Sequence, residues 1–419
     1  MDIGAFSPTS STSSPTPSSS VSMAMHEDPA SSLASFPRDV ALAMQSFLVQ
    51  LRRGQIRESK DIAKGTAELM RQVVANSRWD DIRGLVAVLK AVGKRLLAAQ
   101  PRELLVVNIV CRIVHIVNEE AASVEVVSEP VLAGAGRKAS LDTDGVGTPP
   151  ARGSETPMTM GVGQSGMLAQ GLGEQVAATL SKRTMDMFRL KSSIIQEINE
   201  YIDELEGTED DIAEKALDYI HSNEVVLTCG RSRTVEMFLR AAARKRKFHV
   251  IVTESAPRYD GHEQARALRC ANIEVVVIPD SAVFAIMSRV NKVILGTRVV
   301  MANGGLIAPS GTHMIAAAAR HHSTQVVVCA GQYKHSPSFP FDDDRFNTLT
   351  SPDAVLPYRD GGLVDAVEVA NPSFDYVPPE LVDILVDNTG SHLPSYLYRL
   401  LQENYDSAKD FVWTIYDQQ

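Results

Sequence analysis

The sequence predicts an α/β fold, in which an N-terminal all-α helical domain precedes a doubly wound, mainly parallel sheet domain of the Rossmann-like type. Before about residue 216, apolar residues recur at the spacing of amphipathic helices. From Asn223 onward they form short β-branched runs about twenty residues apart, with helical stretches between them. Strands buried on both faces explain these uninterrupted apolar runs, and their spacing fits β–α–β crossovers.

Residues 1–38 are predicted to form a disordered tail. Ser, Thr and Pro dominate this stretch, so it has too little apolar surface to offset the entropy lost on folding. The first helix is expected to begin near Asp39, as its N-cap, and to end before Gly54. Three further amphipathic helices are predicted around residues 62–73, 82–96 and 105–117.

Residues 127–173 interrupt the helical pattern, because they are rich in Gly and Pro and show no periodicity. We interpret them as a disordered insertion within the helical domain, since helical spacing resumes beyond them in a long helix through residues 194–205. The helical domain therefore takes in residues 39–126 and 174–216. Within the insertion, Arg137 and Lys138 before Ser140 match a kinase site, although such short patterns are common by chance.

The sheet domain is predicted to span residues 217–408 and to be followed by a C-terminal tail, residues 409–419. Its closing elements are a strand near Val367 and helices near residues 381–386 and 394–404. The expected strands are 225–228, 249–253, 273–278, 293–296 and 325–329, and the helices between them are 234–247, 262–270, 281–290 and 312–321.

Composition restricts the class of protein. The chain has 419 residues and a formal net charge of −10, which argues against direct nucleic-acid binding because that needs a basic face. No apolar run is long enough to span a membrane, and no apolar signal segment is evident, so we expect a cytoplasmic protein without membrane contact. Four cysteines without a CxxC pair are expected to be reduced and buried: Cys111, Cys229, Cys270 and Cys329.

Two loops at the carboxyl ends of strands are candidate ligand contacts, since ligands of doubly wound sheets bind at that edge. In the first, Arg231 and Arg233 could hold a phosphate at the start of a helix. The same loop could instead be a plain Ser/Thr cap with solvated arginines, which is the commoner arrangement. In the second, Glu254 and Arg258 could act as an acid and an anion clamp, or form a salt bridge that orders the loop.

A third loop, residues 303–312, combines the features of an anion site with the absence of reactive groups. It follows an apolar strand, turns at two glycines and opens a helix at Thr312, which would present free backbone N–H groups to an anion. It has no carboxylate, lysine or cysteine; Arg298 precedes it, and Ala308 and Pro309 lie within it. The frame of a phosphosugar enzyme is therefore expected here without its chemical groups.

Two adjacent histidines end the helix that follows. His321 and His322 point to different sides of a helix and have no carboxylate or cysteine at ligand spacing. Favourable charge at the helix C-terminus explains them better than a metal site does. No metal and no cofactor are predicted.

Short motifs follow the predicted strands in a fixed order: Thr253-Glu254-Ser255, Ala302-Asn303-Gly304, Gly311-Thr312 and Asn371-Pro372. In this order they resemble the family of regulatory subunits of eukaryotic translation initiation factor 2B. That family is related to two enzymes, methylthioribose-1-phosphate isomerase and ribose-1,5-bisphosphate isomerase. The resemblance covers roughly residues 39–126 and 174–408.

By this resemblance, the catalytic groups of the isomerases fall at positions where the chain has other residues. The catalytic Cys corresponds to Gly230, the catalytic Asp to Arg298, and the Asn-Lys pair that helps hold the sugar phosphate to Ala308 and Pro309. The resemblance therefore implies a protein that is not an enzyme and has no catalytic residues. The residues of these loops are grouped as the degenerate pocket: Gly230, Arg231, Arg233, Glu254, Arg298, Asn303, Gly304, Ala308 and Pro309.

The resemblance implies a non-catalytic regulatory subunit of the guanine-nucleotide exchange factor for translation initiation factor two. Such subunits scaffold the complex and help to sense phosphorylation of the substrate's alpha subunit. The implied partners are the paralogous alpha and delta regulatory subunits, with delta nearest, the catalytic gamma and epsilon subunits, and the alpha subunit of factor two.

Other interpretations stay open from the sequence. Asn223 and His249 could contribute to a subunit interface, or they could be ordinary polar ends of strands. The main alternative function is a phosphosugar isomerase or a phosphometabolite-sensing domain, in which Arg231, Arg233 and Arg298 form the clamp. A free-standing homodimer that uses the same sheet surface is a further alternative.

Overall fold

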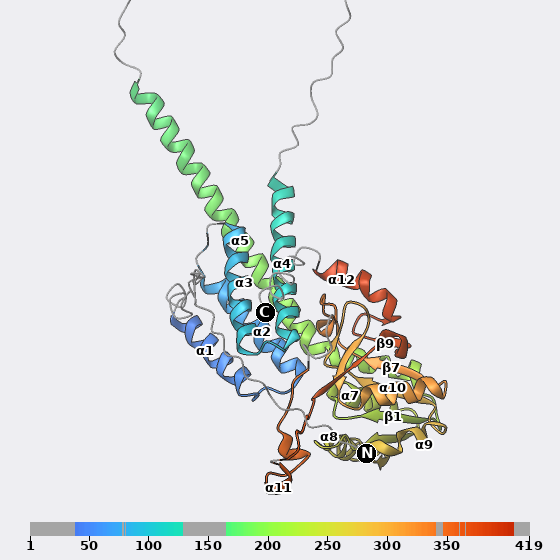
Figure 1. Ribbon diagram of the computed structural model, residues 1–419. Helices are drawn as coiled ribbons and strands as arrows, with labels where there is room; N and C mark the ends of the chain where they lie inside the picture. Colours follow the sequence, from blue (N-terminus) through green and yellow to red (C-terminus); the bar gives the residue numbers. More distant parts are fainter. Residues whose placement is uncertain are drawn as a thin grey trace, which may run out of the picture.

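The structure, a computed structural model, describes residues 38–77, 79, 81–128, 165–340, 347–359, 361–364 and 366–405. A group of helices lies beside an α/β part, and α5 (Ser165–Glu214) runs from one to the other (Figure 1). Residues 1–37 and 409–419 of the predicted tails lie outside the described residues, as does the Arg137, Lys138 and Ser140 pattern. Within the described ranges, none of the helices combines the length and the apolar character needed to cross a membrane.

The helical part confirms the predicted amphipathic helices. Before α5 come α1 (Arg38–Arg52), α2 (Ser59–Asn76), α3 (Ile82–Ala99) and α4 (Leu104–Ser128). Asp39 lies in the first turn of α1 and is not its cap. The predicted insertion, residues 127–173, overlaps helices at both ends, because α4 extends to Ser128 and α5 already begins at Ser165. Once a helix is nucleated, each further residue adds a hydrogen bond, so it can extend through glycines that a pattern excludes.

The predicted mainly parallel sheet is also confirmed. Its strand order is β10-β9-β7-β4-β1-β2-β3, and every described pairing in it is parallel except that of β10 with β9. The strands are β1 (Val225–Cys229), β2 (His249–Thr253), β3 (Glu274–Ile278), β4 (Lys292–Gly296), β7 (Gln325–Cys329), β9 (Ile384–Val386) and β10 (Ser391–His392). The helices that accompany it are α6 (Ala216–Tyr219), α7 (Arg233–Ala243), α8 (Asp260–Cys270), α9 (Val283–Met287), α10 (Thr312–His321), α11 (Gly361–Val364) and α12 (Leu397–Tyr405).

A second, three-stranded sheet was missed from the sequence. Its order is β5 (Val299–Val300), β6 (Leu306–Pro309) and β8 (Phe374–Val377). The predicted direct passage from strand through turn to helix is therefore wrong, since an antiparallel hairpin stands between β4 and α10. Gly304, with φ +85°, lies in the turn of this hairpin.

Three other predicted elements are wrong near the C-terminal half of the sheet. The helix expected at 381–386 is strand β9, and the strand expected near Val367 is β8 at Phe374–Val377. The helix expected at 281–290 is a short 3-10 turn, Asp280–Ala282, followed by α9. A short run of apolar residues fits the period of a helix and that of a strand equally well, so periodicity alone does not decide which of the two it forms.

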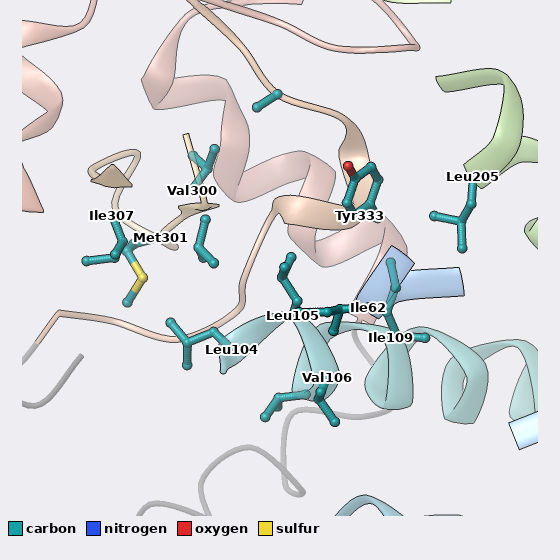
Figure 2. Packing of buried hydrophobic residues seen from close by; sticks show 14 of the residues in the cluster. Ile62, Leu104, Leu105, Val106, Ile109, Leu205, Val300, Met301, Ile307 and Tyr333 are labelled. Carbon is teal, nitrogen blue, oxygen red and sulfur yellow. The ribbon is translucent and has the colours of Figure 1, made fainter. Parts of the chain in front are cut away.

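One apolar core joins the helical part to the sheet. The same buried cluster includes Ile62 of α2, Leu105 and Ile109 of α4, Ile307 of β6, and Tyr333 in the 3-10 turn Gln332–Lys334 after β7. Figure 2 shows these side chains gathered in one view. Each fully buried aliphatic side chain contributes about 1.5–3 kcal/mol, so this shared core fixes the position of the helices relative to the strand ends. The division at residues 216 and 217 stays a prediction.

Candidate functional site

The ends of β1 and β2 bring part of the degenerate pocket together. These strands are parallel neighbours, so the loops that begin at Gly230 and Glu254 lie at the same edge of the sheet. The backbone N–H of Gly230 donates to Ser255 Oγ at 2.9 Å. A Cβ at Gly230 would lie 3.8 Å from Pro309 Cβ, which places the hairpin strand β6 against the same loop. The structure thus assembles Gly230, Glu254 and Pro309 at one place.

Cys229 is a buried thiol at this edge. Its Sγ lies 3.5 Å from Ser255 Oγ, and burial raises the pKa of the thiol. A thiol that stays protonated is a poor nucleophile. Cys229 is therefore a structural residue here, as are the buried Cys111 and Cys329. The prediction of a buried thiol is wrong for Cys270, which is exposed because it is the last residue of α8.

The first loop is capped as the commoner interpretation predicts. Ser232 is the N-cap of α7, and its Oγ accepts from the Val235 N–H at 3.4 Å. Arg231 pairs with Glu263 at 2.7 Å, and both side chains are about half exposed. Arg233 binds carboxylates of the same chain.

Arg233 lies between two acidic groups of the helical part. It contacts Glu58 and Glu209, each at 3.2 Å. The side chain of Glu209 is buried and also contacts Lys60 at 3.2 Å. Arg233 therefore acts as a link between α7 and the helical part, and its positive charge is already balanced.

Arg298 makes the most buried ion pair of the degenerate pocket. Its guanidinium donates to Glu103, just before α4, and the two side chains are 18% and 6% exposed. It also donates to the Arg57 carbonyl at 2.9 Å and to Ser59 Oγ at 3.2 Å. Arg298 thus ties the segment after β4 to the helical part.

A buried lysine beside this pair was not singled out from the sequence. Lys334 Nζ donates to the Thr297 carbonyl at 3.0 Å. Burial, with the nearby charge of Arg298, lowers the pKa of Lys334 from its ordinary 10.5 to about 8. A lone lysine just past the carboxyl end of a predicted strand was the available signal.

The N-terminus of α10, expected to be open to an anion, is occupied by the chain itself. Asp375 Oδ2 accepts from the backbone N–H of Gly311 at 2.6 Å and of His313 at 3.3 Å. A carboxylate at this position satisfies free N–H groups and suits the helix dipole. No local sequence pattern indicates this contact, because Asp375 lies 64 residues from Gly311.

Three further residues of the degenerate pocket build the small sheet. Asn303 donates to Tyr376 Oη at 2.7 Å and accepts from the Gly305 N–H at 2.9 Å, which closes the turn around Gly304. Ala308 is opposite Asp375 in the ladder of β6 and β8, one step from Pro309. These residues therefore have structural roles that explain their types.

In the loop after β2, Arg258 forms its ion pair with a residue that neither interpretation of the sequence named. Arg258 pairs with Asp260 at 2.9 Å, so the predicted salt bridge with Glu254 is wrong. Asp280 orders the loop instead, because its carboxylate accepts from the N–H groups of Ser255 and Ala256 at 3.0 and 2.7 Å. Glu254 is partly exposed and contributes its backbone N–H to the Ile278 carbonyl.

Asn223 and His249 lie at the amino ends of the strands, the edge opposite the degenerate pocket. Asn223 is exposed, with φ 65°, and its N–H donates to the Lys247 carbonyl at 2.7 Å. His249 is exposed, and its Nδ1 lies 2.9 Å from Glu274 of β3. Both residues therefore have a partner within the chain. Their side chains are exposed, and their role in a subunit interface stays a prediction.

His321 and His322 contact an aromatic ring. Their ring centroids lie 5.0 and 4.9 Å from that of Phe284. Within the described ranges, no group of three or more His, Cys, Asp or Glu side chains has the arrangement of a metal site.

The arrangement can be compared with known proteins. The pattern of the initiation factor 2 subunit family matches residues 55–394. The chain belongs to the initiation factor 2 subunit family. The resemblance noted in the loop motifs is therefore confirmed.

Within the initiation factor 2 subunit family, one similar protein is translation initiation factor eIF2B subunit beta of Dictyostelium discoideum. It is 41% identical over 385 residues, which is 88% of this chain and 96% of that relative. The runs 243–252, 284–293 and 374–381 likewise resemble the beta subunit.

A solved structure and an enzyme complete the comparison. A chain of the tetrameric eIF2B-beta2-delta2 complex from Chaetomium thermophilum has a TM-score of 0.62 and 26% identity, over 87% of this chain and 95% of that chain. Ribose 1,5-bisphosphate isomerase of Archaeoglobus fulgidus is 32% identical over 219 residues, 51% of this chain and 68% of the enzyme. The chain is thus similar both to translation-factor subunits and, over about half of its length, to an isomerase.

Proposed function

We propose that the chain is a regulatory, beta-type subunit of translation initiation factor 2B, the guanine-nucleotide exchange factor for translation initiation factor two. The similarity to a subunit of that name extends over nearly the whole of both chains. In this role the chain scaffolds the complex and helps to sense phosphorylation of the substrate's alpha subunit. The site of action is the cytoplasm.

The proposed partners follow from the same comparison. A similar chain is part of a beta2-delta2 complex, which supports a delta-type paralogue as the direct partner. The alpha-type paralogue, the catalytic gamma and epsilon subunits and the alpha subunit of factor two complete the proposed set. Asn223 and His249, exposed at the amino edge of the sheet, are the proposed interface residues.

One observation carries the non-catalytic part of the proposal: the anion-binding groups of the degenerate pocket already hold carboxylates. Glu103 forms an ion pair with Arg298, and both Glu58 and Glu209 form ion pairs with Arg233. Asp375 accepts a hydrogen bond from the N-terminus of α10. A phosphosugar would have to displace these groups and leave buried acids such as Glu103 unpaired, which is costly. The frame therefore serves as a support for assembly.

Affinity purification of the full chain from its own cells tests the assembly role. We expect a delta-type paralogue and the catalytic subunits to co-purify in fixed ratio. Recovery of the chain alone, or only as a homodimer, would exclude the proposal.

The identity to an isomerase favours one alternative, an active or ligand-sensing phosphosugar protein. Purified full chain should show neither turnover of ribose 1,5-bisphosphate nor heat of binding in calorimetry. Turnover at a rate above that of buffer, or saturable tight binding, would favour the alternative, in which Arg231, Arg233 and Arg298 form the clamp.

A further inference from the structure

A groove of about 800 Å³ lies along the crease between α5 and α7, and its lining includes Arg231 and Arg233 of the degenerate pocket at the start of α7. Its apolar lining residues are Ala213 and Leu217 on the side of α5 and Met237 and Ala241 of α7. In Figure 1 the lower end of α5 meets α7 beside the sheet.

Several charged residues of the lining are paired, since Glu236 contacts Arg240, Arg233 contacts Glu58 and Arg231 contacts Glu263. The remaining charges on the two walls have opposite sign. Asp210 and Glu214 are four residues apart on α5 and therefore share a face, while Arg244 and Lys245 follow the end of α7 on the other side. All four residues are exposed. In the part of the chain that the structure describes, none of these four side chains takes part in an ion pair.

Local helix stability explains only one of the walls. Basic groups suit the C-terminal end of α7, but acidic groups at the C-terminal end of α5 oppose the helix dipole there. A bound polyanion, such as a nucleic acid, would be repelled by Asp210 and Glu214. A ligand that satisfies both walls must carry both signs of charge on opposite flanks of an apolar stripe.

We infer that this groove binds an amphipathic helix of another protein chain, with acidic residues facing Arg244 and Lys245 and basic residues facing Asp210 and Glu214. The apolar stripe of that helix would rest on Ala213 and Met237. The size is suitable: α7 has 11 residues, which is about 16 Å, or three turns of a partner helix. Helix-in-groove binding of this kind is a common mode of peptide recognition. This inference holds whether or not the exchange-factor assignment does.

The test uses three synthetic helical peptides with one apolar stripe and different flanks. One has a basic and an acidic flank, one has two acidic flanks, and one has two basic flanks. Fluorescence anisotropy with the purified full chain should show that the mixed peptide binds at least about tenfold more tightly than either of the others. Equal affinities, or no binding of the mixed peptide, would refute the inference.

Two variants of the full chain make the test specific for the walls. The double substitution Arg244→Glu and Lys245→Glu makes both walls acidic, so the preferred peptide should become the one with two basic flanks. Asp210→Lys with Glu214→Lys should instead select the peptide with two acidic flanks. A gain of binding cannot arise from misfolding, because it requires the groove to be present. Unchanged preferences in both variants would also overturn the inference.

Discussion

At the scale of single residues, the degenerate pocket is defined by how its charges are paired. Arg298 contacts one buried carboxylate and two neutral oxygens, whereas Arg231 contacts one exposed carboxylate. The buried pair is held in a low dielectric and its partners cannot turn to water, so the two arginines should differ strongly in their effect on stability.

Replacing Arg298 with alanine should lower the free energy of unfolding by roughly 3–5 kcal/mol, because Glu103 would be left buried without a counter-charge. The matched control is Arg231→Ala, which should cost about 1 kcal/mol or less. Urea denaturation followed by fluorescence measures both values. An equal decrease in the free energy of unfolding of the two variants would show that the buried ion pair stabilises the fold no more than the exposed one.

His335 predicts a dependence of stability on pH. It is buried, its Nε2 lies 4.0 Å from Asp387 Oδ2, and His392 lies on the other side of Asp387. Burial outweighs the attraction of Asp387 and lowers the pKa of His335 from its ordinary 6.5 to about 4. Between these pH values the unfolded chain binds the proton and the folded chain does not. The stabilisation is therefore complete above pH 6.5 and is lost as the pH falls toward 4.

The loss due to His335 is on the order of 3 kcal/mol across that interval. Urea midpoints measured at several pH values should fall more steeply for the natural chain than for His335→Gln, which cannot take up the proton. Carboxylates that do not contact His335 contribute equally to both curves, so the difference isolates His335 and its neighbour Asp387. Parallel curves would contradict the assignment of a buried neutral imidazole.

At the scale of elements, the hairpin between β4 and α10 depends on glycines with positive φ. Gly304 has φ +85°, and a Cβ there would lie 2.9 Å from both Pro394 Cβ and the Pro394 carbonyl oxygen. Gly311 has φ +95° but no atom within 4 Å of such a Cβ. An alanine at Gly311 would therefore meet backbone strain alone, whereas an alanine at Gly304 would meet backbone strain and a steric clash.

Gly311→Ala should cost about 1–2 kcal/mol, from the left-handed backbone alone. Gly304→Ala should cost a further 1–3 kcal/mol or so, because the neighbouring backbone must also move. Thermal unfolding monitored by circular dichroism measures both. Equal melting temperatures of the two variants would contradict the close contact between Gly304 and Pro394.

The sequence predicted elements with strong periodicity and missed those without it. Helices α1 to α4 and the parallel strands were long or apolar enough to be found, whereas β5 has only two residues and β9 only three. Ser232 was found as a cap because its effect is local. The partners of Arg298 and of the α10 N-terminus were not found, because Glu103 is 195 residues from Arg298 and Asp375 is 64 from Gly311. Such contacts depend on the tertiary fold.

At the scale of the whole molecule, the shared core and the ion pairs act in the same direction. Leu105, Ile109 and Tyr333 join the helical part to the sheet by apolar packing. Arg298 and Arg233 join the same two parts by charge. The carboxyl edge of the sheet is thereby held against the helical part by the chain's own side chains, which suits a subunit that acts through assembly.

The rate of GDP release from translation initiation factor two tests this account most directly. It would be measured with the exchange complex reconstituted from its other subunits, with and without this chain, on unmodified and phosphorylated substrate. We predict that only the complete complex gives fast release, and that phosphorylation of the substrate slows it. A complex without the chain that releases GDP at the same rate, with the same response to phosphorylation, would contradict the account.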